Sequence, residues 1–266
     1  MNVVPAFETL LLDIDARGVA RLTLNRPDTH NALSATLIGD LRRACDWLNG
    51  AKGLRALVLT GAGNTFCAGG DLQWMQQNAK KTRAERVAES SELALMLRAL
   101  NDLPLPVIGR INGSAYGGGI GMISVCDIAI AVDTGVYSLT EVRLGLLPAN
   151  ISPYVVARMG EANARRTFLT ARRMTATEAQ RLGLVSEVVG PEQLDSAVER
   201  ELADLLQCAP DAVSATKKLI SYVYSHDIST SAIYTADKLA DAWETDEGRE
   251  GIDAFFAKRS PVWRQT

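Results

Sequence analysis

The most informative segment of this chain reads VIGRINGSAYGGGIG and spans residues 107–121. Its first five residues, Val107–Ile111, form a short apolar run of the kind that becomes a strand buried on both faces. Glycines crowd the next ten residues, and glycine lets the backbone turn tightly and approach a ligand closely because it has no Cβ. The segment therefore predicts a buried strand that leads through a glycine-rich turn into a short helix.

A second segment of the same kind occurs earlier in the chain. The apolar run Leu54–Leu59 precedes Phe66-Cys67-Ala68-Gly69-Gly70-Asp71-Leu72, in which Asp71 is well suited to cap a following helix. Free N–H groups at such a helix start favour negative charge. Two of these turns side by side would offer two N–H donors to one carbonyl oxygen, an oxyanion hole in which each donor contributes about 3–4 kcal/mol. Each cluster alone could be a tight turn, whereas the pair favours the oxyanion hole.

Strands and helices alternate on both sides of these two segments. Leu10–Ile14 and Val19–Leu24 are β-rich runs separated by a turn, and they predict a hairpin. Ser34 stands at the N-cap position of an amphipathic helix, and Ala84–Leu100 predicts a long helix stopped by prolines. With a further buried strand at Ile128–Val132, this order predicts an α/β core with crossover connections.

The last quarter of the chain has helical periodicity without intervening strands. We therefore expect residues 1–191 to form the core with the active site, and residues 192–266 to form a helical region. That region could close the site and mediate oligomerisation, or it could be a plain extension of the core. The predicted helices are Glu192–Leu206, Asp211–Tyr224, Ile228–Trp243 and Glu247–Phe256.

Composition excludes several classes of protein. The 266 residues include 28 Lys and Arg against 31 Asp and Glu, a net charge of −3, and 47% are hydrophobic, as in an ordinary globular domain. There is no basic run of the kind that binds nucleic acid and no apolar run of about 18–20 residues that could span a membrane. The start, Met1–Pro5, shows no export signal, and the four separated cysteines suit a reducing compartment. We therefore expect a cytoplasmic protein without a metal site.

Other catalytic motifs fit poorly. Gly61-Ala62-Gly63 follows a strand but lacks the third glycine of a dinucleotide-binding loop, and Gly113–Gly117 is misspaced for a nucleophile elbow. The histidines, His30 and His226, are far apart in the sequence, and each favours a surface or packing role. Cys67 favours a buried thiol over a nucleophile. The glycine pair therefore remains the best candidate for chemistry.

The motifs taken together resemble the crotonase (enoyl-CoA hydratase/isomerase) superfamily along essentially the whole chain. The resemblance implies a spiral of ββα units, a helical C-terminal region for trimer assembly, and homotrimers that commonly pair into hexamers. The matching segments are Leu24–Pro27, Asn31–Leu33, Phe66–Asp71, Gly113–Gly119, Cys126-Asp127, Glu141–Pro148, Ala179–Val189 and Ala254–Arg259.

The resemblance also implies an acyl-CoA thioester substrate and no cofactor besides the CoA that the substrate carries. By motif position, the oxyanion donors are the N–H groups of Gly70 and Gly118. Lys258 falls where the family often places a basic residue near the CoA phosphate. Further substrate or CoA contacts are expected at Ala68, Gly69, Asp71, Leu72, Gly117, Gly121 and Asn150.

One catalytic carboxylate of the family pattern is missing. Family hydratases commonly use two glutamates, and this chain has Glu141 at one position and Gly121 at the other. A lone Glu141 could still transfer protons, with Asn150, Ser152 or Tyr154 as candidates for holding water. We hypothesise that Gly121 leaves room for a branched acyl group.

Three functions follow from this pattern. The segments Asp71–Met75, Gly117–Gly121 and Pro148–Tyr154 look like those of bacterial hydratases for methylglutaconyl-CoA or isohexenylglutaconyl-CoA, in leucine or acyclic-terpene breakdown. The first function is therefore hydration of a branched 2-enoyl-CoA. The alternatives are a double-bond isomerase that uses one glutamate and a catalytically weak CoA-binding protein.

Overall fold

The computed structural model describes residues 4–264, and the chain divides into two compact units. The first unit comprises the residues up to Leu103 together with Val107–Val198, and the second comprises Pro104–Pro106 and the residues from Glu199 onward. The boundary expected between residues 191 and 192 thus precedes the division between the units, which falls inside a helix. Met1–Val3, part of the start that showed no export signal, lie outside the described residues.

The larger sheet of the first unit is mixed. β1 and β2 form an antiparallel hairpin, and the other strands pair in parallel. β3 is buried along its whole length, as its continuous apolar sequence predicted. In spatial order the sheet contains β1 (Leu10–Ile14), β2 (Val19–Leu24), β3 (Ala56–Gly61), β5 (Val107–Ile111), β7 (Ile128–Val132) and β10 (Glu187–Val189).

A smaller sheet receives the strand that follows each central strand of the larger one. β4 comes directly after β3, β6 after β5, and β8 after β7, so each repeat adds one strand to each sheet. This is the ββα repetition that the resemblance implied. The smaller sheet runs in the order β4 (Thr65–Cys67), β6 (Ser114–Tyr116), β8 (Val136–Ser138) and β9 (Met174–Thr175).

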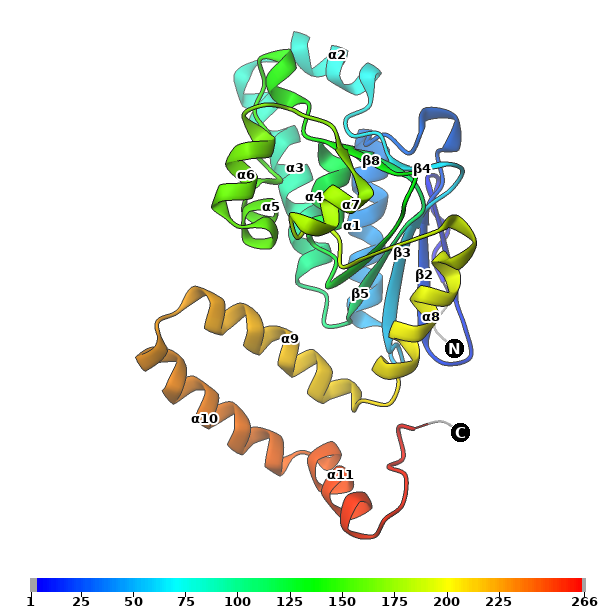
Figure 1. Ribbon diagram of the computed structural model, residues 1–266, viewed down its shortest axis with the longest axis vertical. Helices are drawn as coiled ribbons and strands as arrows, with labels where there is room; N and C mark the ends of the chain where they lie inside the picture. The colour runs from blue at the N-terminus through cyan, green and yellow to red at the C-terminus, as the bar shows by residue number, and fades with distance from the viewer. Residues whose placement is uncertain (1–3, 265–266) are drawn as a thin grey trace. The chain divides into compact units, whose positions relative to one another are not determined.

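Helices fill the connections between these strands (Figure 1). α1 (Ala35–Gly50) begins at Ser34, whose side chain accepts a hydrogen bond from the N–H of Leu37 at 3.2 Å, as the sequence predicted. α1 packs along α3 (Arg83–Asn101), and α2 (Leu72–Lys80) precedes α3. The unit also contains the start of α8 (Leu194–Leu205), up to Val198. Its remaining helices are η1 (Pro27–Thr29), α4 (Gly118–Ser124), η2 (Glu141–Leu144), α5 (Ser152–Met159), α6 (Glu161–Phe168), α7 (Ala176–Arg181) and η3 (Pro191–Gln193).

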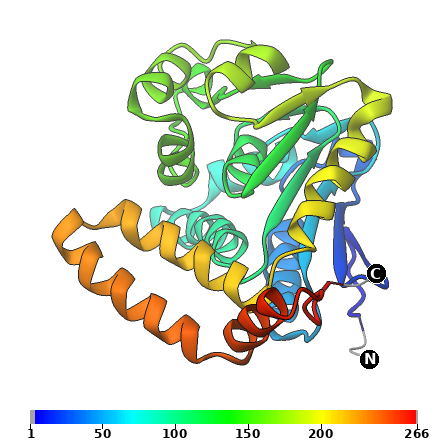
Figure 2. The same cartoon turned by 60° about the horizontal axis from the view of Figure 1, so that its bottom comes forward.

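The second unit is helical. α9 and α10 run side by side in opposite directions and α11 packs against both, as Figure 2 shows. Many apolar side chains of these helices face solvent in the single chain, among them Ile228, Ile233, Phe255 and Phe256. The bounds are α9 (Pro210–Ser225), α10 (Ile228–Glu244) and α11 (Asp246–Phe256). Among the residues described, no helix is both long and apolar enough to cross a membrane.

Candidate active site

The two glycine-rich turns lie side by side. β4 and β6, the strands that lead into them, pair in parallel with Thr65 opposite Ser114 and Cys67 opposite Ala115. Gly69 has a φ of +86°, and a Cβ there would lie 2.9 Å from the carbonyl oxygen of Tyr116. Only glycine allows this approach, because the left-handed conformation and the close carbonyl both exclude a side chain. Pairing of the smaller sheet therefore brings together two loops that are about fifty residues apart in sequence.

Each turn presents an unused backbone donor. Gly118 is the first residue of α4, so its N–H has no partner within the helix. Gly70 forms an isolated bridge with Leu33, in which the neighbouring groups make the hydrogen bonds and the N–H of Gly70 does not. Within residues 4–264, neither N–H donates to a protein acceptor. These are the two donors that the sequence assigned to the oxyanion hole.

Leu33 connects the two donors. Its N–H donates to the carbonyl of Gly69 at 2.7 Å, and its carbonyl accepts from the N–H of Asp71 at 3.0 Å. Its Cδ1 atom fills the space into which a Cβ at Gly118 would extend. The buried Leu33 side chain therefore fixes the start of α4, while its backbone holds the turn at Gly70.

Glu141 lies against the second turn. It is the first residue of η2, and its Oε1 atom is 2.9 Å from the position that a Cβ of Gly117 would occupy. Its Oε2 atom is buried and has no hydrogen-bond partner among the described residues. Burial raises the pKa of the Glu141 carboxyl, and the hydrogen bond from its own backbone N–H only partly opposes this effect. Glu141 thus has a desolvated carboxyl whose Oε2 atom is free of protein partners, which is typical of a general acid or base.

These groups together can support chemistry at a carbon next to a carbonyl. Two free N–H donors can stabilise the oxyanion that forms when the carbonyl becomes an enolate. A carboxyl of raised pKa beside them can transfer the proton at that carbon. Since burial raises the pKa of the Cys67 thiol to about 12, this cysteine is a poor nucleophile, in agreement with the sequence analysis.

The surroundings of Gly121 favour a packing role for this glycine. A Cβ at Gly121 would lie 2.9 Å from the Cβ of Ile151, closer still to its Cγ2, and 3.5 Å from Leu97. Protein side chains therefore already fill the space that we expected Gly121 to leave for a branched acyl group. The absence of a side chain lets α4 pack closely against Ile151.

The three candidates for holding water are engaged elsewhere or partly buried. The side-chain amide of Asn150 exchanges hydrogen bonds with the hydroxyl of Ser90 in α3, at 2.8 and 3.1 Å. The hydroxyl of Ser152 donates to the carbonyl of Ala149 at 2.7 Å. Tyr154 packs partly buried against the core, and burial raises its pKa. Asn150 thus joins its loop to α3, and none of the three has an evident catalytic role.

The other predicted contacts lie in both units. Ala68 and Gly117 belong to the two turns, and Asp71 caps α2 by accepting from Gln73 and Trp74, as predicted. Leu72, the first residue of α2, is 75% exposed and so is free to contact a ligand. Lys258 follows α11 in the second unit and is exposed, and its contact with CoA phosphate stays a prediction.

Sequence reasoning missed two side chains that pack against Gly70, the residue that carries the first donor. Met75 Sδ lies 3.3 Å, and the Trp74 ring 3.9 Å, from the position of a Cβ on Gly70. The indole N–H of Trp74 donates to Glu89 in α3 at 2.9 Å, and Lys81 donates to the same carboxylate at 2.6 Å. The signal was the pair of large apolar residues one turn after Gly70, on the helix that Asp71 caps.

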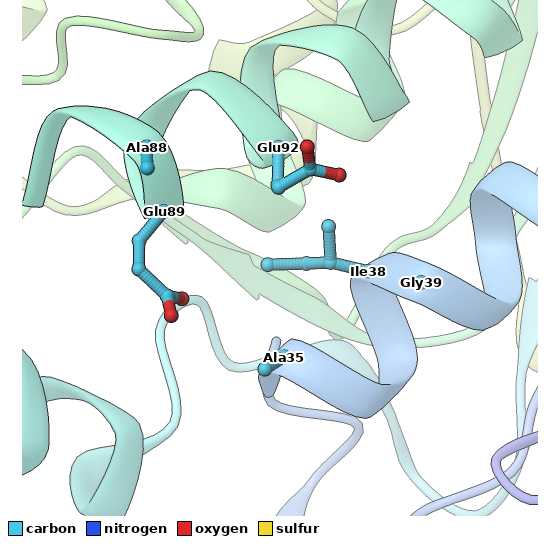
Figure 3. Close-up of a pocket in the computed structure, with 6 residues that line it drawn as sticks. All are labelled: Ala35, Ile38, Gly39, Ala88, Glu89 and Glu92. Carbon is cyan, nitrogen blue, oxygen red and sulfur yellow. The ribbon is translucent and has the colours of Figure 1, made fainter. Parts of the chain in front are cut away.

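A cavity of about 240 Å³ lies between α1 and α3 (Figure 3). The side chain of Ile38 extends from α1 toward α3, where the carboxylates of Glu89 and Glu92 border the space. None of the lining residues carries the donors or the general base. The lining consists of Ala35, Ile38, Gly39, Ala88, Glu89 and Glu92. Within the described part of the chain, no group of three or more His, Cys, Asp or Glu could hold a metal ion.

Comparisons with known proteins agree with this geometry. The family model described as enoyl-CoA hydratase/isomerase matches residues 15–266. YngF of Bacillus subtilis is 34% identical over 260 residues, which cover 97% of this chain and 98% of the relative. The crystal structure of an enoyl-CoA hydratase from Shewanella pealeana superposes with a TM-score of 0.93 at 35% identity, over 97% and 96% of the two chains. Pseudomonas aeruginosa AtuE gives 0.92 at 40% identity, over 97% and 100%.

Proposed function

This chain belongs to the enoyl-CoA hydratase/isomerase family, and we propose that it adds water to a 2-enoyl-CoA, or removes it in reverse. The proposal rests on one observation above all. The Glu141 carboxyl, whose Oε2 atom has no partner among the described residues, lies beside the turn of Gly118. The N–H groups of Gly118 and Gly70 are both free of protein acceptors there. Because one carboxyl faces two oxyanion donors, it can transfer protons to and from an enolate.

The reaction can proceed with one carboxylate. Glu141 removes a proton from a water molecule while the water oxygen forms a bond to C3 of the enoyl group. The C2–C3 π electrons move toward the thioester, and the resulting enolate oxygen is held by the N–H groups of Gly70 and Gly118. The protonated Glu141 then delivers its proton to C2, which restores the carboxylate and leaves the 3-hydroxyacyl-CoA. Because one group serves both steps, water and proton add to the same face.

A double-bond isomerase is the second candidate, and the single glutamate supports it. Glu141 would remove the C2 proton of a 3-enoyl-CoA and return it to C4, with the same two donors holding the dienolate oxygen. This reaction requires no water. The surroundings of Gly121 and Asn150, which supply no second base, are compatible with it.

For the substrate we propose a branched glutaconyl-type enoyl thioester. Support comes from the segment Ile151-Ser152-Pro153-Tyr154, which is similar to that of hydratases for such substrates. In this chain Ile151 packs against Gly121 of α4, and Asn150 is hydrogen-bonded to Ser90 of α3. This segment replaces the glycine-rich segment common in straight-chain hydratases, so we expect the acyl site of this chain to accept a different acyl group.

The test is an absorbance assay at the enoyl-thioester band with a panel of straight and 3-branched 2-enoyl-CoA and 3-enoyl-CoA thioesters. Hydration removes the conjugated band, isomerisation of a 3-enoyl thioester creates it, and inert binding changes neither. We expect hydration, fastest on 3-branched substrates. Glu141→Gln should lower kcat by about 10²–10⁴-fold while affinity changes little. The control Glu161→Gln, at an exposed glutamate of α6, should keep full activity. An active Glu141→Gln enzyme would refute the proposed role of Glu141.

We also propose that the second unit assembles the chain into homotrimers, and trimers into hexamers. Its helices expose many large apolar side chains in the single chain, more than an isolated soluble unit usually leaves uncovered. Ile228 is 89% exposed, and Phe255 and Phe256 are 76% and 78% exposed. A second copy of the chain would cover these side chains and remove their cost of hydration.

A further inference from the structure

Arg26 pairs with Asp71, which follows Gly70 in the first glycine turn, and it is not among the groups that we assign to the proton transfer. Its guanidinium donates from Nη2 to Oδ2 of Asp71 at 2.9 Å and from Nη1 to the carbonyl of Ala32. The side chains of Arg26 and Asp71 are only 21% and 11% exposed. A half-buried arginine with two oriented acceptors is held in one geometry, unlike the mobile arginine of a surface ion pair.

The two acceptors lie on opposite sides of one backbone bridge. Ala32 directly precedes Leu33, and Asp71 directly follows Gly70, and Leu33 pairs with Gly70. The guanidinium therefore joins the two segments of that bridge. The hydrogen bonds of the bridge itself, from Leu33 to Gly69 and from Asp71 to Leu33, are 2.7 and 3.0 Å long.

The same residues reach both oxyanion donors. Gly70 is a member of the bridge, and the Leu33 side chain packs against the position of a Cβ on Gly118. Asp71 also accepts from the N–H groups of Gln73 and Trp74, which fixes the start of α2. A shift of the bridge would thus move Gly70 directly and Gly118 through Leu33.

Asn31 holds the other end of this segment. Its buried side chain accepts from the N–H of Arg26 at 2.9 Å and donates to the carbonyls of Ala62 and Thr65 at 2.9 and 2.8 Å. The backbone of Arg26 is therefore fixed against β4 and the loop before it. Because the backbone of Arg26 is held in place, its guanidinium can hold the Asp71 carboxylate in a fixed position.

We propose that Arg26 is a positioning residue of the oxyanion hole: with Asp71, it holds the Leu33–Gly70 bridge so that the N–H groups of Gly70 and Gly118 converge on one oxygen. This inference rests on the proposed function, because it assumes that a thioester oxygen occupies the hole. Misplacement of reacting groups by about 1 Å can cost about 10²-fold in rate, so the effect should be large although Arg26 touches no substrate.

The first test compares turnover in four variants. Arg26→Gln should lower kcat by roughly 10–100-fold with KM within about threefold, because donor placement matters most in the transition state. Arg26→Lys keeps the charge without the two-pronged geometry, so it should recover only part of the loss. Asp71→Asn should lower kcat as Arg26→Gln does. The asparagine oxygen can still cap α2, but its amide group carries no charge and turns an N–H donor toward the Arg26 donor, so the bond to Arg26 is lost.

The fourth variant, Asp40→Asn, is a matched control. Asp40 is also a buried aspartate that binds backbone N–H groups, those of Glu8 and Thr9, and one arginine, Arg43. It lies in α1, and none of its partners belongs to either turn, so its loss should lower the melting temperature without a selective loss of kcat. Equal kcat losses in Asp40→Asn and Asp71→Asn would overturn the proposal.

The second test measures the oxyanion hole itself. In the Glu141→Gln background, in which turnover is expected to be slow, bound 2,4-hexadienoyl-CoA should show a red-shifted absorption band because hydrogen bonds polarise its carbonyl. Adding Arg26→Gln or Asp71→Asn should remove at least half of that shift, whereas Asp40→Asn should leave it intact. If the Glu141→Gln protein binds the probe without any red shift, the proposed function itself fails. If the shift is present and survives both Arg26→Gln and Asp71→Asn, the positioning role alone is refuted.

Discussion

The packing of Gly121 against Ile151 can be tested by a double-mutant cycle. Gly121→Ala places a methyl group 2.9 Å from the Cβ of Ile151 and 3.5 Å from Leu97, in a region where all three residues are fully or nearly fully buried. Because Ile151 and Leu97 already fill this space, the substitution overpacks the core. Overpacking of this kind typically costs about 1–3 kcal/mol in the free energy of unfolding. For a chain of this size, each kcal/mol corresponds to about 2–4 °C in melting temperature.

Removing the opposing side chain should reduce the cost. Ile151→Ala alone leaves a cavity and should cost about 2–5 kcal/mol, as for other buried isoleucines. In the double variant Gly121→Ala/Ile151→Ala, the closest clash, with Cγ2 of Ile151, disappears. The 2.9 Å contact with the Cβ remains, and a small shift into the cavity relieves it while the new methyl group fills part of that cavity. The two substitutions should therefore be less destabilising together than the sum of the singles, by about 1–3 kcal/mol, the upper range for residues in contact.

The assay is urea unfolding of the four proteins, followed by circular dichroism, with hydration of a straight and a 3-branched 2-enoyl-CoA measured alongside. Gly121→Glu, with its larger side chain, should lose stability and both activities together while Ile151 is present. Additive losses in the cycle would refute the packing argument. A well-folded Gly121→Glu enzyme that loses only the branched substrate would instead revive the hypothesis that Gly121 leaves room for the acyl branch.

Three further predictions follow from the same structure. Burial raises the pKa of Glu141 above 4.5 and the reaction needs the carboxylate, so kcat/KM should fall as the pH drops through that raised pKa. At higher pH the ionisation of Glu141 favours the unfolded state, so Glu141→Gln should melt higher than wild type near pH 8 and lose this advantage near pH 4. A gain in melting temperature that grew toward low pH would contradict the assignment. Gly118→Pro and Gly118→Ala both add atoms against Leu33, but only proline removes the N–H of residue 118. Relative to alanine, proline should therefore lower kcat by a further factor of about 10²–10³, and equal kcat values in the two variants would exclude Gly118 as a donor. Light scattering should give a multiple of 28.7 kDa for the full chain, and deletion of residues 211–266 should cause aggregation, whereas a purely monomeric full chain would refute assembly.

Periodicity and local capping determined most elements of the fold from the sequence. Leu10–Ile14, Val19–Leu24 and Val107–Ile111 have the predicted bounds because each is a short β-rich run bounded by turn residues. Ser34 and Asp71 cap their helices because a side-chain oxygen one residue before a helix can reach the free N–H groups of its first turn. The strands of the smaller sheet were less visible. Each has only two or three residues, which is too short for an alternating pattern.

The sequence also identified the chemical groups of the candidate site. Two glycine clusters after buried strands predicted a pair of backbone donors, and the family resemblance assigned these donors to Gly70 and Gly118 and the carboxyl to Glu141. Tertiary structure decided how these groups are surrounded. It placed Ile151 in the space beside Gly121, directed Asn150 to Ser90, and joined Arg26 to Asp71 across a bridge between distant segments. Such contacts depend on which residues meet across the fold, and local sequence patterns report only the neighbours along the chain.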